Sequence, residues 1–166
     1  MIRLYMPADA SLRERGFTLI EVLVVVAILG ILAAVAAPNF ATFMGTINSK
    51  SVALDLVNDL VTARGEAVKR NETVTLAPIS GNWSNGWQVT TGTGTVLKSH
   101  EALKYSLALT GASSAGGVVF QPNGRLAADS SPGNLNWLIS STINGVASRC
   151  VVITPTGSAR SKMGAC

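Results

Sequence analysis

The feature that most limits how this chain can fold is an apolar run from residue 17 to residue 38. Between Arg15 and Lys50 the only ionisable side chain is Glu21. An α-helix rises about 1.5 Å per residue, so about 21 residues reach about 31 Å, enough to cross the hydrocarbon core of a bilayer. The run therefore predicts a membrane-spanning helix.

The charges on either side of the run predict its orientation. Arg13 and Arg15 precede it directly, and no basic residue follows until Lys50. Basic residues are concentrated on the cytoplasmic side of membrane spans. We therefore expect a single pass with the N-terminus in the cytoplasm and the rest of the chain outside.

A secretory signal peptide, cleaved near Ala34-Val35-Ala36, is the alternative interpretation of this run. The run is longer than the roughly 7 to 15 apolar residues of a signal peptide. It also contains Glu21, which costs roughly 2.5 to 3.5 kcal/mol at the centre of a membrane helix. A helix that stays in place and pairs this carboxylate accounts for that cost.

Residues 15–23, Arg-Gly-Phe-Thr-Leu-Ile-Glu-Val-Leu, resemble the class III leader junction of type IV pilins and type II secretion pseudopilins. The resemblance implies that a prepilin peptidase removes residues 1–16 by cutting between Gly16 and Phe17, and that Phe17 is then methylated. It implies that Glu21, the fifth mature residue, pairs with the N-terminal amine of a neighbouring subunit. That pairing fits the chemistry, because a buried carboxylate without a partner is costly. It also implies an inner-membrane protein with a periplasmic head, which later enters a pilus or pseudopilus.

The helical pattern continues from residue 39 to about residue 71, where it becomes amphipathic. Apolar residues at i, i+3, i+4 and i+7 spacing define one face. That face comprises Ala53, Leu56, Val57, Leu60, Val61, Ala63, Ala67 and Val68. The opposite, polar face comprises Asp55, Asn58, Asp59, Thr62, Glu66 and Lys69. We expect one helix of about 50 residues with a local bend near Pro38, and the alternative is a helical hairpin broken at Pro38 or Gly45.

Beyond residue 71 the pattern changes to short strands and turns, so residues 72–166 are expected to form a β-rich head. The candidate strands are Thr73–Ile79, Gly86–Thr91, Thr95–Leu97, Gly117–Gln121, Leu135–Ser140 and Cys150–Thr154. Three tripeptides predict turns, because proline presets φ and glycine accepts positive φ: Pro122-Asn123-Gly124, Pro155-Thr156-Gly157 and Gly92-Thr93-Gly94. The stretch from Gly111 to Gly117 predicts a loop. The expected fold class is α+β, with an antiparallel sheet packed against the C-terminal half of a long N-terminal helix.

Parts of this head resemble GspH/FimT-type minor pilins and pseudopilins. The similarity lies in residues 63–71, Trp83, residues 86–89, residues 118–120 and 123–125, and a late strand that bears a cysteine. Trp83 and Trp87 are expected in the core of the head, as tryptophans in small domains usually are. His100 is expected on a solvated loop.

Cys150 and Cys166 both lie close to the C-terminus. An even, closely spaced pair in a chain that crosses a membrane predicts one disulfide in an oxidising compartment, and two free thiols are the alternative. The bond would close a loop of about 15 residues and contribute about 3 kcal/mol on the chain-entropy model. It would hold the C-terminus against a strand.

The composition gives no sign of catalysis. A single histidine, His100, cannot form a metal cluster alone, and no nucleophile motif accompanies it. The net charge of +4 is too small to indicate a nucleic-acid binder by itself. We expect neither enzyme activity nor a bound cofactor or metal.

A possible DNA contact comes from a second resemblance. Some FimT-like minor pilins bind DNA through a C-terminal Gly-Arg-x-Arg motif, and residues 157–160, Gly-Ser-Ala-Arg, are similar to it with serine at the first arginine. The resemblance implies weak binding through a basic patch of Arg149, Arg160 and Lys162 that contacts phosphates. The alternative is that these are ordinary solvated charges near a chain end.

Together these resemblances imply a minor pilin that initiates or caps a type IV pilus, serving twitching, adhesion or DNA uptake. Its partners would be the prepilin peptidase, the inner membrane, and other pilins or pseudopilins contacted through the N-terminal helix. The alternatives are a minor, GspH-like pseudopilin of a type II secretion system and a DNA-binding pilin for natural transformation. All three share one kind of stem, so the sequence does not separate them.

Overall fold

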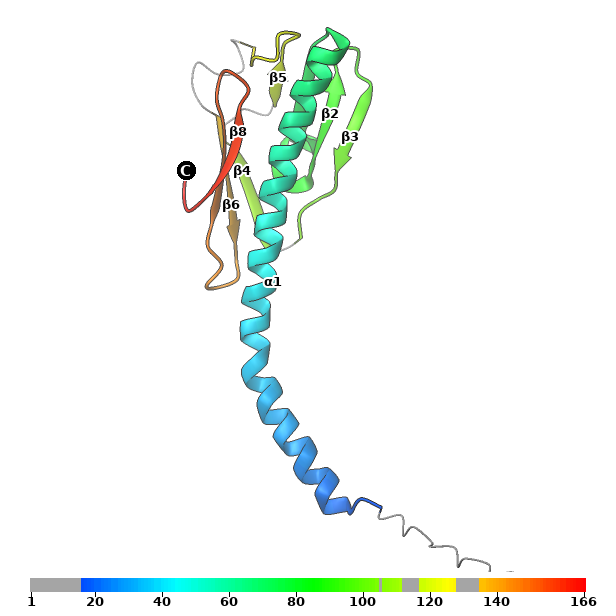
Figure 1. Cartoon of the computed structure of the whole chain (residues 1–166), viewed down its shortest axis with the longest axis vertical. Helices are drawn as coiled ribbons and strands as arrows, with labels where there is room; N and C mark the ends of the chain where they lie inside the picture. Colours follow the sequence, from blue (N-terminus) through cyan, green and yellow to red (C-terminus); the bar gives the residue numbers. More distant parts are fainter. Residues whose placement is uncertain (1–15, 105, 112–116, 128–134) are drawn as a thin grey trace, which may run out of the picture. The chain divides into compact units, whose positions relative to one another are not determined.

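One long helix precedes a set of short strands (Figure 1). The computed structural model describes residues 16–104, 106–111, 117–127 and 135–166, and for residues 36–38 the backbone alone. The chain divides into two units, residues 1–38 and residues 39–166. The predicted leader up to residue 15 and most of the loop predicted between Gly111 and Gly117 lie outside the described residues.

Helix α1 runs from Leu19 to Arg70 and has 52 residues, which confirms the long helix and not the hairpin. It ends because Asn71 adopts a left-handed φ of 55°. The amide of Asn71 donates to the carbonyl of Val68, and the amide of Glu72 donates to that of Ala67, both at 3.3 Å. This pair of bonds is a Schellman cap, which satisfies carbonyls left without partners at a helix end.

The strands form two four-stranded antiparallel sheets, where the sequence predicted one. The strands are β1 (Val74–Pro78), β2 (Trp87–Thr91), β3 (Val96–His100), β4 (Leu107–Gly111), β5 (Val118–Phe120), β6 (Leu135–Ser141), β7 (Arg149–Ile153) and β8 (Ala159–Met163). The first sheet has the order β3-β2-β1-β5 and the second has the order β4-β6-β7-β8. Two short 3-10 turns, η1 (Ile79–Gly81) and η2 (Trp83–Asn85), separate β1 from β2.

Both sheets and the second part of α1 contribute to one core. On α1 the buried apolar residues include Leu56, Leu60, Ala63 and Ala67. Buried and half-buried residues alternate along β1, β2 and β6, as the period of two in a strand requires. Trp83 and Trp87 are buried, as predicted, and the Trp83 ring packs edge to face on Trp137 with centroids 5.4 Å apart.

Six of the described strands overlap predicted ones, whereas β4 and β8 were not predicted. Strand β8 reads Ala-Arg-Ser-Lys-Met and lies at a sheet edge, where no apolar alternation is needed. Strand β4 does alternate, with Leu107 and Leu109 buried between exposed neighbours, but it is short. The predicted turns are confirmed, since Gly94, Gly124 and Gly157 all adopt positive φ.

The predicted positions of four residues were wrong. Asp59 is 1% exposed although it was placed on the polar face of the helix, and it is tolerated there because Trp87 and Lys98 pair with it. Val61 and Val68 were placed on the buried face and are exposed, because α1 turns Leu60, Ala63 and Ala67 toward the sheets instead. His100 is the last residue of β3 and stacks on Trp87, so it is not a loop residue.

Candidate functional site

The start of α1 carries the residues predicted for processing and assembly. Gly16 and Phe17 precede the helix, and Phe17 is exposed. The amide of Glu21 donates to Thr18 Oγ1 at 3.3 Å. Thr18 and Glu21 have the Thr-x-x-Glu spacing of a capping box. This signal is present in the sequence, and it gives Glu21 a position at the helix start in addition to its predicted role between subunits.

An apolar hollow adjoins the Glu21 carboxylate. Phe17, Glu21 and Val25 are spaced four residues apart, and with Val22 and Val26 they line a space of about 210 Å³. Within the part of the chain that the structure describes, Glu21 forms no ion pair. A carboxylate beside apolar side chains is costly unless a group of opposite charge pairs with it.

The apolar side chains of residues 19–35 are largely exposed in the part of the chain that the structure describes. The large ones are between 49% and 84% exposed. Among the described residues, no single helical stretch is both long enough and apolar enough to cross a bilayer. The stretches Leu19–Val35 and Asn39–Arg70 meet these two criteria only when they are taken together. So much exposed apolar surface marks a region of contact with a membrane or another protein.

A second apolar surface, the heptad column, follows the later part of α1. It consists of residues exactly seven apart that are 45% to 64% exposed: Phe40, Ile47, Leu54, Val61 and Val68. Seven-residue spacing keeps side chains close to one helix face and is typical of a seam that packs on a second helix. Gly65 lies on this face between Val61 and Val68, and a methyl group there would meet nothing within 4 Å.

The three basic residues predicted to contact DNA lie on both faces of the second sheet. Lys162 is paired with Cys150 and Arg160 with Val152, so these two cations share a face of β8. Arg149 is paired with Met163, one register position further on. It therefore points to the opposite face, and the sheet brings together Arg160 and Lys162 only.

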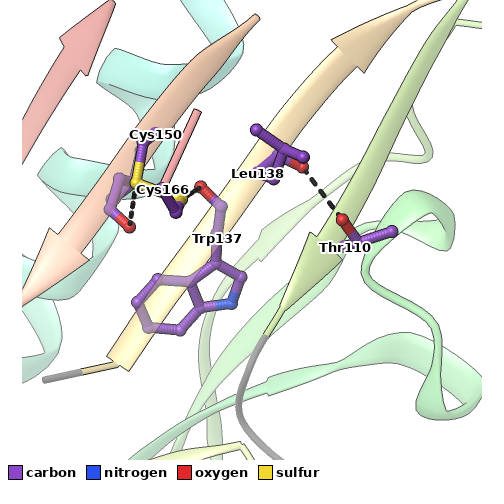
Figure 2. Close-up of a disulfide and its surroundings, with 6 residues drawn as sticks. Thr110, Trp137, Leu138, Cys150 and Cys166 are labelled. Carbon is purple, nitrogen blue, oxygen red and sulfur yellow. Dashed lines mark hydrogen bonds between the residues drawn. A yellow bond between two sulfur atoms is a disulfide. The ribbon is translucent and has the colours of Figure 1, made fainter. Parts of the chain in front are cut away.

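The disulfide closes the C-terminus onto the face that carries Arg160 and Lys162. Cys150 and Cys166 are bonded, which confirms the predicted pair. Figure 2 shows the bridge beside β6, with the Cys166 sulfur 3.4 Å from the carbonyl oxygen of Trp137. Cys166 also borders a hollow of about 270 Å³ with Thr110, Gly111, Asn136 and Leu138.

A polar cluster around the buried Asp59 joins β2 and β3 to α1, and the sequence did not predict it. Asp59 accepts a hydrogen bond from Trp87 Nε1 at 2.8 Å, and its other oxygen lies 2.5 Å from Lys98 Nζ. His100 stacks on the Trp87 ring with centroids 3.9 Å apart, and its Nε2 lies 3.6 Å from Asp55 Oδ2. The four-residue spacing of Asp55 and Asp59 on α1 was a readable signal, because it puts both carboxylates on one helix face.

The last turns of α1 carry a surface ion pair. Arg70 Nε lies 2.6 Å from Glu66 Oε2, and Lys69 Nζ lies 3.4 Å from Glu66 Oε1. The hydrogen bond from Arg70 holds the pKa of Glu66 below its ordinary value, and the same bond raises the pKa of Arg70. Basic side chains at a helix C-terminus also interact favourably with the helix dipole.

Comparisons with known proteins agree with these features. Residues 11–37 match the family model described as the prokaryotic N-terminal methylation motif. A stretch of 31 residues is 71% identical to the Type IV major pilin protein PilA of Myxococcus xanthus, and it covers 19% of this chain and 14% of that protein's length. The likeness to that pilin is thus confined to a short segment.

Solved structures with the same fold come from two filament systems. The crystal structure of the Pseudomonas aeruginosa type IV minor pilin FimU aligns with a TM-score of 0.55 and 22% identity, over 70% of this chain and 87% of that one. The Vibrio cholerae minor pseudopilin EpsH of the Type 2 Secretion System aligns with a TM-score of 0.53 and 12% identity, over 70% of this chain and 97% of that one. At these identities the alignments establish the pilin-like α+β fold.

The family model described as Type II transport protein GspH matches residues 52–157, well over half of the chain. That range takes in residues 52–70 of α1, the first sheet, and strands β4, β6 and β7 of the second sheet. The chain therefore belongs to the GspH family and is a GspH/FimT-type minor pilin or pseudopilin with an N-terminal hydrophobic helix.

Proposed function

We propose that this chain is a minor pilin that initiates or caps a type IV pilus, and that it acts by assembly and not by catalysis. The observation that carries the proposal is the long helix whose large apolar side chains are exposed in the described part of the chain, from residues 19–32 through the heptad column. The likeness to a type IV minor pilin and the pilin segment match favour a pilus as the destination.

In this proposal the helix first resides in the inner membrane and then moves into a filament. A prepilin peptidase cuts between Gly16 and Phe17, Phe17 is methylated, and residues 17–38 span the membrane with the head in the periplasm. Removal of the leader creates a new amine at Phe17. That amine is the chemical partner that the Glu21 carboxylate of a neighbouring subunit lacks.

Pairing at Glu21 also selects the register of neighbouring helices. A carboxylate in an apolar surrounding costs several kcal/mol when unpaired. A one-turn slip between two helices moves them by about 5.4 Å and removes the contact. Only the register that brings an amine to Glu21 avoids this cost, so one acidic residue suffices to align two stems.

The first experiment measures pilin sheared from the surface of a strain that lacks this gene. We expect a large loss, restored by the wild-type gene and not by a gene encoding Glu21→Gln, which keeps the side-chain shape and removes the charge. Immunoblotting should show normal leader removal for Glu21→Gln, which separates assembly from processing. Full restoration by Glu21→Gln would refute the pairing, and unchanged pilus levels in the deletion strain would refute the pilus role.

A role as a minor pseudopilin in type II secretion is the second candidate. The family description and the likeness to EpsH favour it. Secretion of exoproteins by the same deletion strain distinguishes the two candidates. Normal pilus levels with lost secretion would assign the chain to the secretion system.

DNA binding is a third candidate, favoured by the shared face of Arg160 and Lys162. If these cations contact phosphates, the double variant Arg160→Gln/Lys162→Gln should weaken binding and lower its salt dependence. Arg149→Gln is the control, because it removes one positive charge from the opposite face and should leave binding nearly unchanged. Equal affinity of the double variant and the wild type for duplex DNA would remove this candidate.

A further inference from the structure

Strand β3 is an edge strand, and two of its side chains link it to α1. Among the described strands it pairs with β2, and that pairing contains a register shift between Val89 and Thr90. Lys98 and His100 are two residues apart, so they share one face of β3. They meet Asp59 and Asp55, which are four residues apart on α1, and the two pairs form parallel links between strand and helix.

The link between Lys98 and Asp59 is the fixed one of the two. Asp59 is buried, and its two oxygens are taken by Lys98 Nζ and Trp87 Nε1. This link therefore anchors the middle of β3 to α1.

The link between His100 and Asp55 is conditional on one proton. His100 Nδ1 lies 2.8 Å from the carbonyl oxygen of Glu101, and a carbonyl can only accept, so Nδ1 carries a hydrogen. In the neutral ring Nε2 is then an acceptor that faces the Asp55 carboxylate at 3.6 Å. Two acceptors that face each other repel, whereas a protonated Nε2 makes an ion pair with the same carboxylate.

Neighbouring side chains hold the two partners of this link in place. Trp87 from β2 stacks on His100 with an interplanar angle of 13°, and an aromatic face attracts a cation. The Ser51 hydroxyl donates a hydrogen bond to Asp55 Oδ2 at 3.3 Å, which helps to fix the position of that carboxylate. The other charged groups around the adjoining cavity of about 340 Å³ are Glu101 and Lys104, which are of opposite sign.

We propose that His100 and Asp55 form a proton-controlled clasp that fastens the end of β3 to α1. With the ring protonated, the clasp holds His100 and the segment to Lys104 over the cavity. With the ring neutral, the pair is repulsive, and the segment after β3 detaches from α1 while Lys98 still anchors the strand. The surface around the cavity thus changes with external acidity, independently of how the filament assembles.

Hydrogen–deuterium exchange on the full-length chain in detergent micelles tests the clasp. After correction for intrinsic rates, residues 96–104 should be about two- to fivefold more protected at pH 5.5 than at pH 7.5. His100→Gln should lose this difference, because glutamine takes no charge. Asp55→Asn should lose or reverse it, because an asparagine amide can donate to the neutral ring.

Glu101→Gln is the matched control, since it removes another carboxylate from the same cavity wall and should keep the acid protection. If His100→Gln fails to fold by circular dichroism, the comparison of Asp55→Asn with Glu101→Gln still decides. Acid protection in Asp55→Asn equal to that of the wild type would overturn the proposal. So would greater protection of residues 96–104 at pH 7.5 in the wild type.

Discussion

The two parts of α1, residues 19–35 and residues 39–70, are made of the same secondary structure but rely on different partners. The first part is apolar on all sides and exposed along its length. The second part has one side buried against two sheets, a polar cluster at Asp59, and an exposed heptad column. A helix that is hydrophobic all round is stable only inside another apolar environment. The first part is thus completed by a membrane or by other subunits, and the second is completed mainly by its own chain.

The largest effect that this comparison predicts is on the stability of the head. Leu60→Ala removes a fully buried side chain and should lower the free energy of unfolding by about 2 to 5 kcal/mol. The exposed neighbour Val61→Ala should change it by less than about 0.5 kcal/mol. Urea denaturation followed by tryptophan fluorescence measures both, because all three tryptophans lie in residues 39–166. Equal losses for the two variants would mean that α1 does not pack as described.

The contrast between Leu60 and Val61 also shows what the sequence could predict. Periodicity identified the helix, six strands and the buried core of α1, because these follow from local spacing. It misplaced Val61, Val68 and Asp59, because their positions depend on how two sheets share the helix. A carboxylate such as Asp59 is stable inside a protein only with partners, and Trp87 and Lys98 are distant in sequence.

The residues of the candidate site also fall into two groups, those that local sequence patterns identified and those whose positions required the structure. Glu21 and the disulfide cysteines were identified from local patterns, and the structure confirms the bond between Cys150 and Cys166. The separation of Arg149 from Arg160 and Lys162 required the register of β7 and β8. Strand β8 itself was missed, since an edge strand with charged side chains has no apolar alternation.

The disulfide should contribute the next largest effect, and only to the second unit. Cys166→Ser should lower the free energy of unfolding by about 3 kcal/mol, because the unfolded chain loses a closed loop of about 15 residues. Cys166 is the better choice for substitution, since Cys150 is fully buried and its loss would also perturb the core. Urea denaturation with and without dithiothreitol provides the measurement. Reductant should destabilise the wild type and leave Cys166→Ser unchanged, and any other pattern would contradict a structural role.

A smaller effect of opposite sign is expected at Gly65, which lies within the heptad column of the second part. Gly65→Ala should raise the free energy of unfolding by about 1 kcal/mol, because alanine favours a helix and nothing within 4 Å obstructs it. If the heptad column packs closely on another helix, Gly65→Leu should nevertheless reduce incorporation into filaments. Thr62→Leu is the control, since Thr62 is exposed but lies to the side of the column. Normal incorporation of Gly65→Leu would show that the column, unlike the stem, is not a contact between subunits.

The smallest effect concerns the surface ion pair at the end of α1 and depends on pH. Because Arg70 lowers the pKa of Glu66 in the folded chain, the unfolded state takes up the proton first as the pH falls. The stability that the pair contributes is therefore present at pH 7 and is lost between about pH 5 and pH 3, as the folded carboxylate protonates. Glu66→Gln should be slightly less stable than the wild type at pH 7 and equal to it at about pH 3. Thermal unfolding across this range gives the difference, and a gap that widened on acidification would mean that Glu66 is stabilised by something other than its charge.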